Sequence, residues 1–456
     1  MDFTKLPLFA EAEIVVCGGG TAGAFAAISA GKMGRDVLVV ESLGSLGGTA
    51  TNGLVLPIMS THIKGEPQCS YVSNLVRDRL LAVGAIDERG ANFDPIMLKT
   101  VLEELCVESG VRILYNTFIA EAVVSDGKLT DIVVANKSGL GRIHAKTFID
   151  ATGDADVCVR AGAEYTKGNP KNGKNQPISL RYIVSGVDYD EFGRQLNEEA
   201  SRTGLWGTAC YSEGVIYAAC CVGDDWALND IFLKAIENGD LLPEDKAYWQ
   251  GFSVTGRRGC VAFNNPEFFV DTDGTNPEHI TKAQINGKKA IARQLAFCKK
   301  YLRGFENAYV SDIASLVGVR ESRNVKTEYV LTAEDLLRRQ KFDDMFCQSN
   351  YPVDIHGGIF DFDPSGVQPL DDGKPWYEIP FRSLVVKGFD NLMVAGRCLG
   401  AEFLAQSSLR VQHSVRSSGE AAGIGAALAI EKGILPRELD GKEVREIMVK
   451  NGAVYA

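Results

Sequence analysis

The sequence predicts an α/β fold: a Rossmann-like domain that contains a β-meander and is interleaved with a second, α+β domain. Three observations lead to this prediction. Near the start of the chain an apolar strand runs into a glycine triplet and a small-residue helix, strand-like segments separated by turns follow from residue 111, and a second strand, glycine turn and helix occupy 389–431. Residues 162–380 are aromatic-rich and irregular, which indicates a separate domain.

The first β-α-β unit carries a dinucleotide-binding pattern. An apolar run enters Gly18-x-Gly20-x-x-Gly23, and the next apolar run ends at Glu41. Gly18 allows the tight turn, Gly20 lets the backbone approach a pyrophosphate, and Gly23 lets the following helix pack close to the sheet. That helix, expected over 22–32, directs its first amides at the phosphates, and Glu41 is placed to accept from ribose hydroxyls. The unit therefore predicts nucleotide binding.

A glycine-rich loop, 45–57, follows and is suited to wrap a second phosphate or a flavin. A helix is expected over 94–109, because Asp94-Pro95 supplies a cap and first-turn residue, the apolar spacing is helical, and Gly110 ends it. These signals continue the nucleotide-binding domain beyond its first unit.

Strand-like segments then form a predicted β-meander inserted in this domain. They cover 111–115, 118–125, 129–136, 139–141 and 143–149, with a turn at Asp126-Gly127. The last strand ends in small residues over Asp150 to Asp154, at the strand end where ligands sit in open α/β sheets.

Near the end of the chain, 389–397 reads as a strand entering a glycine turn, and Ser414 to Glu431 reads as a helix dense in alanine and glycine. Small residues let a helix lie close to a ligand or to a neighbouring backbone. Tight helix packing with no ligand is the alternative reading.

Composition excludes several classes of protein. The 456 residues carry a formal net charge of −11, which disfavours a nucleic-acid or anionic-membrane binder because both need a basic face. The first thirteen residues do not read as a secretory signal, and no apolar run is long enough to cross a membrane. The 11 cysteines lack a C-x-x-C pair, so we expect a reduced cytoplasmic chain with no metal site, and the adjacent Cys220-Cys221 reads as buried apolar residues rather than a redox pair.

Three separated segments together resemble flavoproteins of the glutathione-reductase-like FAD superfamily: the N-terminal triplet with Glu41, Asp150 to Asp154, and Asn391 to Arg397 with its following helix. Within that superfamily, Gly47 to Leu54, Gly318 to Arg323 and Tyr351 to His356 are similar to the broad group called FAD-dependent oxidoreductases. The resemblance covers roughly half of the chain.

The resemblance implies FAD as the cofactor. No histidine lies beside Gly47-Gly48, so the flavin is expected to be noncovalent, unlike the histidyl-linked flavin of some fumarate-reductase-like enzymes. The residues assigned to FAD are Gly18, Gly20, Thr21, Ala22, Gly23, Glu41, Ser42, Gly47, Gly48, Thr49, Ala50, Thr51, Ile119, Ala151, Thr152, Gly153, Asp154, Gly396, Arg397 and Gly423.

One departure from the superfamily narrows the chemistry. Its thiol-disulfide reductases carry two redox cysteines in the loop that matches 47–57, where this chain has Ala50 and Val55. A flavin-to-disulfide relay by that route is therefore excluded. No second glycine triplet occurs, so no dedicated NAD(P)H domain is expected.

A flavin enzyme of this kind must hold its substrate and move one proton. The histidines are His62, His144, His279, His356 and His413. His144 falls in a predicted meander strand and His279 in a polar loop, so both are poor candidates. His356 follows Asp354 by two residues, which puts both on one face of an extended segment; an ordinary surface pair is the alternative. His413, just before the last helix and beside Arg410, would stabilise a reduced flavin or hold a substrate carboxylate.

Arginines supply the candidate anion site. Arg320 and Arg323 flank Glu321 and are suited to bind a carboxylate or phosphate, although an internal ion-pair network is an equal alternative. Tyr351 and Arg382 are weaker candidates, as proton donor and anion clamp. The candidate catalytic residues are thus His356, His413, Arg320, Arg382, Arg410 and Tyr351.

These observations together predict a discontinuous FAD-binding domain, 1–60, 93–160 and 385–456, and a substrate or cap domain, 61–92 and 161–384. The predicted reaction is hydride transfer between flavin N5 and a small polar organic molecule, by C–OH or C–N oxidation or by C=C reduction. A flavin monooxygenase is the alternative enzyme. An FAD-binding module of a macromolecular complex, such as an RNA-modifying one, is the alternative of another class, which the acidic charge disfavours. The electron acceptor and the oligomeric state stay open.

Overall fold

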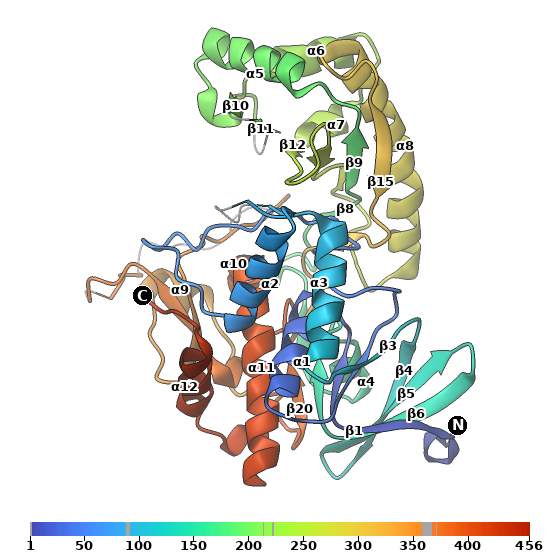
Figure 1. Cartoon of the computed structure of the whole chain (residues 1–456), viewed down its shortest axis with the longest axis vertical. Helices are drawn as coiled ribbons and strands as arrows, with labels where there is room; N and C mark the ends of the chain where they lie inside the picture. Colours follow the sequence, from blue (N-terminus) through green and yellow to red (C-terminus); the bar gives the residue numbers. More distant parts are fainter. Residues whose placement is uncertain (1, 88–91, 213, 221–222, 358–366, 371) are drawn as a thin grey trace.

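The computed structural model describes residues 2–87, 92–212, 214–220, 223–357, 367–370 and 372–456. Figure 1 shows a lower body that holds both chain termini and an upper body formed by the middle of the chain. The side chains of Cys220 and Cys221 lie outside the described residues.

A parallel sheet forms the centre of the lower body. β1 (Leu8–Cys17) pairs with β2 (Val37–Val40) on one side and with β6 (Gly139–Asp150) on the other. β3 (Arg112–Leu114) extends the sheet beyond β2, and β20 (Leu392–Val394) pairs with the end of β6. β1 ends in an uninterrupted apolar run and β2 consists of one, as expected of a sheet that is covered on both faces.

The predicted meander consists of β4 (Phe118–Ser125), β5 (Lys128–Asn136) and the first half of β6, all antiparallel. β6 is one continuous strand, so the two segments predicted at 139–141 and 143–149 are joined. The segment 111–115 was wrongly placed in the meander. It pairs in parallel with β2, because the end of the preceding helix returns the chain beside that strand.

Strand alternation divides β1 between two hydrophobic cores. Ile14 and Val16 face the core beneath the helices, whereas Val15 and Cys17 face a second core under the meander. On the helical side, α1 (Thr21–Lys32) packs along α11 (Gln412–Lys432). Both helices are almost wholly buried, and α1 accordingly lacks a polar face.

Further helices cover this face. α3 (Pro95–Glu108) begins as predicted, with the Asp94 carboxylate accepting from the amides of the first turn. α2 (Tyr71–Ala82) packs against α3, α11 and α12 (Gly441–Asn451). α2 belongs to the segment 61–92 assigned to the cap, and the predicted domain limits stay a prediction.

The upper body is an antiparallel sheet with helices around it, and the long helix α8 runs down one side toward the lower body (Figure 1). Its strands, in sheet order, are β10 (Ala209–Ser212), β11 (Val215–Cys220), β12 (Trp249–Ser253), β13 (Val261–Phe263), β9 (Tyr182–Ser185) and β15 (Tyr309–Ile313). Its helices are α5 (Tyr189–Thr203), α6 (Asn229–Glu237), α7 (Pro243–Ala247) and α8 (Pro277–Tyr301). His279 was expected in a loop but lies in the first turn of α8, because Asn276 caps a helix that starts at Pro277.

Short strand pairs bring distant segments together near the junction of the two bodies. They are β7 (Tyr165–Lys167) with β17 (Arg323–Val325), β8 (Ile178–Ser179) between β14 (Glu267–Phe268) and β16 (Gly318–Val319), and β18 (Met345–Ser349) with β19 (Tyr377–Pro380). Among the described residues, the remaining helices are α4 (Asp156–Arg160), α9 (Ala333–Arg338), α10 (Phe403–Leu409) and short 3₁₀ turns at Phe3–Lys5, Trp206–Thr208, Phe381–Leu384 and Pro436–Glu438.

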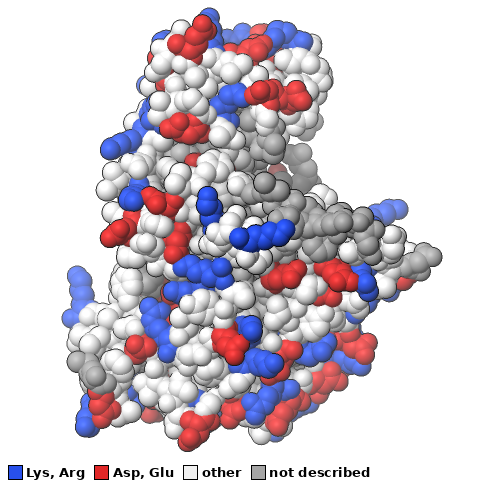
Figure 2. Space-filling view, turned by 180° about the vertical axis from the view of Figure 1, so that it is seen from behind, with Lys and Arg blue, Asp and Glu red and all other residues white. Residues whose placement is uncertain are grey.

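Acidic and basic side chains are intermixed over the face of the molecule shown in Figure 2. Among the described residues, none of the helices has the length and apolar character needed to span a membrane.

Candidate active site

Most residues assigned to the nucleotide line one cavity of about 320 Å³ at the carboxyl ends of β1, β2 and β6. They are Gly18, Gly20, Thr21, Ala22, Glu41, Ser42, Gly48, Thr49, Ile119, Ala151, Thr152, Gly153, Asp154, Gly396 and Arg397. Ligands bind at this edge in open α/β sheets, so the position agrees with the fold. We call it the nucleotide cavity.

The glycine triplet acts through its lack of side chains. Gly18 has φ +93°, and a Cβ there would lie 2.8 Å from the Ala151 carbonyl oxygen. A Cβ on Gly23 would lie 1.8 Å from the Gly18 carbonyl oxygen, so only glycine lets α1 pack this close. Gly20 caps α1 without a side-chain hydrogen bond, which leaves the first amides of the helix free of a side-chain cap at the cavity wall.

Glu41 is buried beside this turn and fixes the local backbone. One carboxylate oxygen accepts from the Gly19 amide at 2.7 Å, and the other accepts from the Leu43 amide at 2.8 Å. The carboxylate also lines the nucleotide cavity. Its role toward a ribose stays a prediction.

Arg397 also lines the nucleotide cavity and provides a positive charge there. Its Nη2 lies 3.0 Å from Asp154 Oδ1, and Asp154 also accepts from the Ser322 hydroxyl at 2.6 Å. The Arg397 Nη1 atom is buried and has no hydrogen-bond partner among the described residues. An unpaired guanidinium nitrogen and an uncapped helix N-terminus in one cavity fit the anionic diphosphate of FAD.

The other assigned residues have packing roles instead of lining this cavity. A Cβ on Gly423 would lie 2.2 Å from the Ala26 carbonyl oxygen, so Gly423 lets α11 contact α1. Gly47 and Thr51 hold the loop together, since the Gly47 carbonyl accepts from Thr21 and the Thr51 hydroxyl donates to Leu46. Gly23 and Ala50 are buried and do not line the nucleotide cavity.

A second cavity, of about 540 Å³, adjoins the first and shares Thr21, Thr49, Arg397 and Val415 with it. We call it the substrate cavity. Its walls come from the 55–59 loop, the start of α11 and the upper body. Its ionisable lining residues are Arg181, Tyr248, Glu267, Arg320, Tyr351, Asp354, His356, Arg397 and Arg410.

The imidazole of His356 lies between two carboxylates in the substrate cavity. Its Nδ1 is 3.0 Å from Glu267 Oε1, and its Nε2 is 3.5 Å from Asp354 Oδ1. Burial, with the charges of Arg320 and Arg410, lowers the pKa of His356 despite the nearby Glu267 carboxylate. The imidazole is therefore neutral near pH 7.

Each carboxylate is also paired with an arginine. Glu267 Oε1 lies 2.6 Å from Arg320 Nη2, and Asp354 Oδ2 lies 3.1 Å from Arg410 Nη2. Burial alone would raise the pKa of Glu267, but Arg320 and His356 outweigh it and hold that pKa below its ordinary value. The Tyr351 hydroxyl donates to Asp354 at 3.2 Å, and burial raises the pKa of Tyr351.

Arg181 differs from its neighbours because the described residues give it no carboxylate within ion-pair distance. Its side chain is 7% exposed and its Nε donates to Asn264 Oδ1 at 2.9 Å. Burial, with repulsion from Arg320, lowers the pKa of Arg181 to about 10. Sequence reasoning missed this residue, although an arginine within the apolar run 178–184 was an available signal.

Comparison with known proteins identifies the family. Residues 13–448 match the family model described as FAD dependent oxidoreductase. The chain belongs to this family. It is therefore an enzyme that uses FAD, and the residues of the nucleotide cavity are suited to hold that cofactor.

Two curated proteins are similar to part of this oxidoreductase. A dihydrolipoamide dehydrogenase from Chaetomium thermophilum is 28% identical over 148 residues, which is 32% of this chain and 29% of that protein. A thiamine thiazole synthase from Methanococcus aeolicus is 28% identical over 161 residues, which is 32% of this chain and 57% of that protein. The aligned part spans less than two thirds of either relative.

Similar solved structures include a geranylgeranyl bacteriochlorophyll reductase-like protein from Thermoplasma acidophilum, with a TM-score of 0.45 and 12% identity over 97% of this chain and 83% of that chain. The p-nitrophenol 4-monooxygenase from Pseudomonas putida DLL-E4 gives a TM-score of 0.47 and 14% identity over 97% and 87%.

In the oxidoreductase, two of the predicted catalytic residues, Arg382 and His413, lie outside the substrate cavity, as does Arg323 of the predicted anion site. Arg382 pairs with Asp344 at 2.9 Å and stacks on the ring of Tyr329, with about half of its side chain exposed. Arg323 pairs with Asp156 at 3.0 Å. The two arginines that flank Glu321 therefore lie in different places. Arg320 lines the substrate cavity, whereas Arg323 forms an ion pair with Asp156 of the nucleotide-binding domain.

His413 was expected just before the alanine- and glycine-rich helix predicted from Ser414, but that helix is α11 and His413 lies in its first turn. Its Nε2 is 3.2 Å from the Gln348 carbonyl oxygen, and its side chain lines a third cavity of about 310 Å³. The substrate cavity of the oxidoreductase thus holds His356, Arg320, Arg410 and Tyr351, but neither His413 nor Arg382.

Proposed function

We propose that this FAD-dependent oxidoreductase transfers a hydride between flavin N5 and a small organic substrate that carries a carboxylate. One observation supports this proposal above the others. Four arginines line the substrate cavity, and one of them, Arg397, is paired with Asp154. The guanidiniums of the other three, Arg181, Arg320 and Arg410, lie against two carboxylates, Glu267 and Asp354. Three positive charges against two negative ones leave an excess that an anionic substrate would neutralise.

The arginines would bind and orient the substrate carboxylate. Arg181 is the best placed for this role, because it has no carboxylate partner among the described residues. Arg410 is held by Asp354, which fixes the direction of its guanidinium. A substrate fixed at its carboxylate presents its neighbouring carbon in one orientation, which is the main requirement for hydride transfer.

His356 would act as the acid or base. FAD, when bound, accepts or supplies the hydride. In oxidation of a C–OH or C–N bond, the neutral imidazole would take the O–H or N–H proton while the hydride leaves the neighbouring carbon. In C=C reduction, the protonated ring would instead give its proton to the carbon next to the one that receives the hydride. Glu267 and Asp354 would fix the ring, and they would stabilise its charge once it is protonated. Tyr351 would stay protonated and donate to Asp354.

We further infer that the nucleotide-binding part belongs to the glutathione-reductase-like superfamily. The N-terminal triplet, Asp150 to Asp154 and Asn391 to Arg397 support this inference, because the strands that carry them, β1, β6 and β20, are adjacent in the central sheet. The loop that would carry the redox cysteines in that superfamily has Ala50 and Val55 instead.

Anaerobic flavin reduction tests the proposed function. The oxidised holoenzyme is mixed with 2-hydroxy acids and 2-amino acids, each beside its methyl ester or amide, and the flavin absorbance is followed; the reduced enzyme is mixed with enoates in the same way. We expect at least one free acid to exchange electrons about 100-fold faster than its neutral derivative, equivalent to ~2.7 kcal/mol of binding. Equal rates with acid and ester would contradict the carboxylate assignment.

A different outcome would favour the monooxygenase. In that case no organic acid reduces the flavin, NAD(P)H does so rapidly, and oxygen is consumed only when an aromatic or other acceptor is added. Arg382→Gln is the matched control for arginine substitutions, because it removes a guanidinium that lies outside the substrate cavity.

A further inference from the structure

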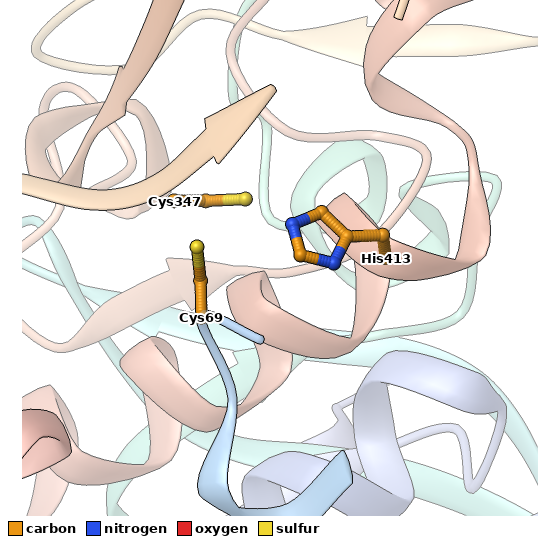
Figure 3. Close-up of side chains that lie close together, drawn as sticks. All are labelled: Cys69, Cys347 and His413. Carbon is orange, nitrogen blue, oxygen red and sulfur yellow. The ribbon is translucent and has the colours of Figure 1, made fainter. Parts of the chain in front are cut away.

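Cys69, Cys347 and His413 form a buried cluster outside the nucleotide and substrate cavities. The two sulfur atoms and one ring nitrogen all lie within 4.8 Å of one another. Figure 3 shows the three side chains converging from different elements. Cys69 lies two residues before α2, Cys347 lies in the middle of β18, and His413 lies in the first turn of α11.

The surroundings of the cluster suit metal-bound sulfur. Both cysteines are 0% exposed and His413 is 7% exposed. The backbone amide of Gln348 donates to Cys69 Sγ at 3.4 Å, a contact of the kind that orients and stabilises a metal-bound thiolate. The Nε2 atom of His413 points toward Cys347 in Figure 3 and lies 3.2 Å from the Gln348 carbonyl oxygen. A metal ion bound to Nε2 would replace the hydrogen bond to this carbonyl.

Two thiolates and an imidazole match the preferences of Zn²⁺. Zinc binds sulfur at about 2.3 Å and nitrogen at about 2.0–2.1 Å, so tetrahedral ligand atoms are ~3.4–3.8 Å apart. The atoms of this cluster are separated by no more than 4.8 Å, so side-chain movements of about 1 Å would close them around one ion. The complex of Zn²⁺ with two thiolates is neutral, which is the charge that a buried site tolerates best.

The fourth position would be open to solvent. Within the described residues, the cluster gains no fourth cysteine, histidine or carboxylate. His413 also lines the third cavity, together with the polar side chains of Glu66, Ser73 and Arg416. A site with three protein ligands beside a polar cavity has room for a water as its fourth ligand.

We propose that Cys69, Cys347 and His413 bind one Zn²⁺ ion, with a water from the third cavity as the fourth ligand. The ion would tie the start of α2 and strand β18 to the first turn of α11. No metal site was expected from the sequence, because ligand pairs at short spacing are absent. Here the ligands come from three remote segments, so spacing carries no signal.

Metal content of the holoenzyme tests the proposal. The protein is produced with zinc supplied, purified under reducing conditions without chelators, and measured by inductively coupled plasma mass spectrometry. We expect about one zinc per chain, and zinc X-ray absorption that shows two sulfur neighbours and nitrogen or oxygen neighbours at the distances above. Chelator removal followed by titration with Zn²⁺ alone should restore the same stoichiometry.

Substitutions of the three residues test whether each of them binds the zinc ion. Cys69→Ser, Cys347→Ser and His413→Asn should each lower bound zinc at least ~10-fold, since loss of one of three protein ligands removes most of the affinity. Cys106→Ser is the matched control, because Cys106 is equally buried but lies outside the cluster, and it should keep its zinc. FAD content measured on each variant shows whether it has folded.

The wild-type protein also provides a test that needs no variant. With zinc bound, Cys69 and Cys347 should resist alkylation until a chelator is added, as located by peptide mass spectrometry. The proposal is overturned by wild-type protein that neither contains nor takes up Zn²⁺. It is equally overturned by a Cys69–Cys347 disulfide in the reduced preparation, or by zinc that persists when both cysteines are replaced.

Discussion

Replacing Arg181 by methionine should stabilise the ligand-free protein and abolish its response to carboxylates. Arg181 is buried beside Arg320, and no carboxylate of the described residues pairs with it. Methionine fills a similar volume without the charge. The two effects have opposite signs, which makes the prediction specific to a residue that is kept for binding.

The size of the stability effect follows from the position of the guanidinium. Burial and Arg320 lower the pKa of Arg181 from its ordinary value of 12.5 to about 10. At ~1.4 kcal/mol per pKa unit, the charged form costs about 3 kcal/mol at any pH well below 10. Loss of the hydrogen bond to Asn264 offsets about 1 kcal/mol of this. The variant should therefore gain about 2 kcal/mol, or roughly 2–4 °C in Tm for a chain of this size.

The assay is thermal unfolding of the holoenzyme with and without small carboxylates such as lactate, succinate and 2-oxoglutarate. A ligand at 100 times its Kd stabilises the native state by ~2.7 kcal/mol, so a bound acid raises the Tm of the wild type by a few degrees. Arg181→Met should start higher and show no such rise. Arg382→Gln, which lies outside the substrate cavity, should respond as the wild type does.

A lower Tm for Arg181→Met together with an unchanged carboxylate response would refute this reasoning. Arg181 would then be a structural residue whose charge is compensated within the protein. A lower Tm with a lost response would leave the binding role standing but show that the burial cost is smaller than the packing of the guanidinium.

Three further predictions concern His356, Gly423 and Gly20. Burial and nearby arginines lower the pKa of His356, and only the neutral ring accepts a proton, so the rate of hydride transfer should fall as the pH drops below 6.5. In His356→Gln the stopped-flow rate should be ~10²–10⁴-fold lower and should lose this pH dependence. Gly423→Ala should destabilise the protein by about 1–3 kcal/mol in urea unfolding, since its Cβ would lie 2.2 Å from the Ala26 carbonyl oxygen. Gly44→Ala is the control and should change stability little, because a Cβ on Gly44 would have no atom within 4 Å. Gly20→Val should fold, because the nearest atom to a Cβ at this position is 3.9 Å away. It should bind FAD at least ~100-fold more weakly by fluorescence titration, because the side chain would project into the nucleotide cavity. FAD binding at wild-type affinity would show that the diphosphate lies elsewhere.

The nucleotide cavity was largely predictable because its requirements are local. Gly18, Gly20 and Gly23 are needed by the backbone of one turn, and that turn follows a strand whose apolar run is visible in the sequence. The cap on α3 was predictable for the same reason, since Asp94 bonds amides two and three residues away. Even here, the sequence could not separate Gly423, which packs helix against helix, from a glycine that contacts a ligand.

The sequence by itself determined a nucleotide-binding α/β domain and the place of His356 beside Asp354, since both depend on residues close together along the chain. It also indicated the FAD family, through three separated motifs that are each local in sequence. Tertiary structure decided what the site contains. It brought Arg181 and Glu267 from the upper body to His356, and it sent Arg323, Arg382 and His413 elsewhere. Contacts of this kind, like the meeting of Cys69, Cys347 and His413, join segments far apart in the chain, and only the packing of the core fixes which of them meet.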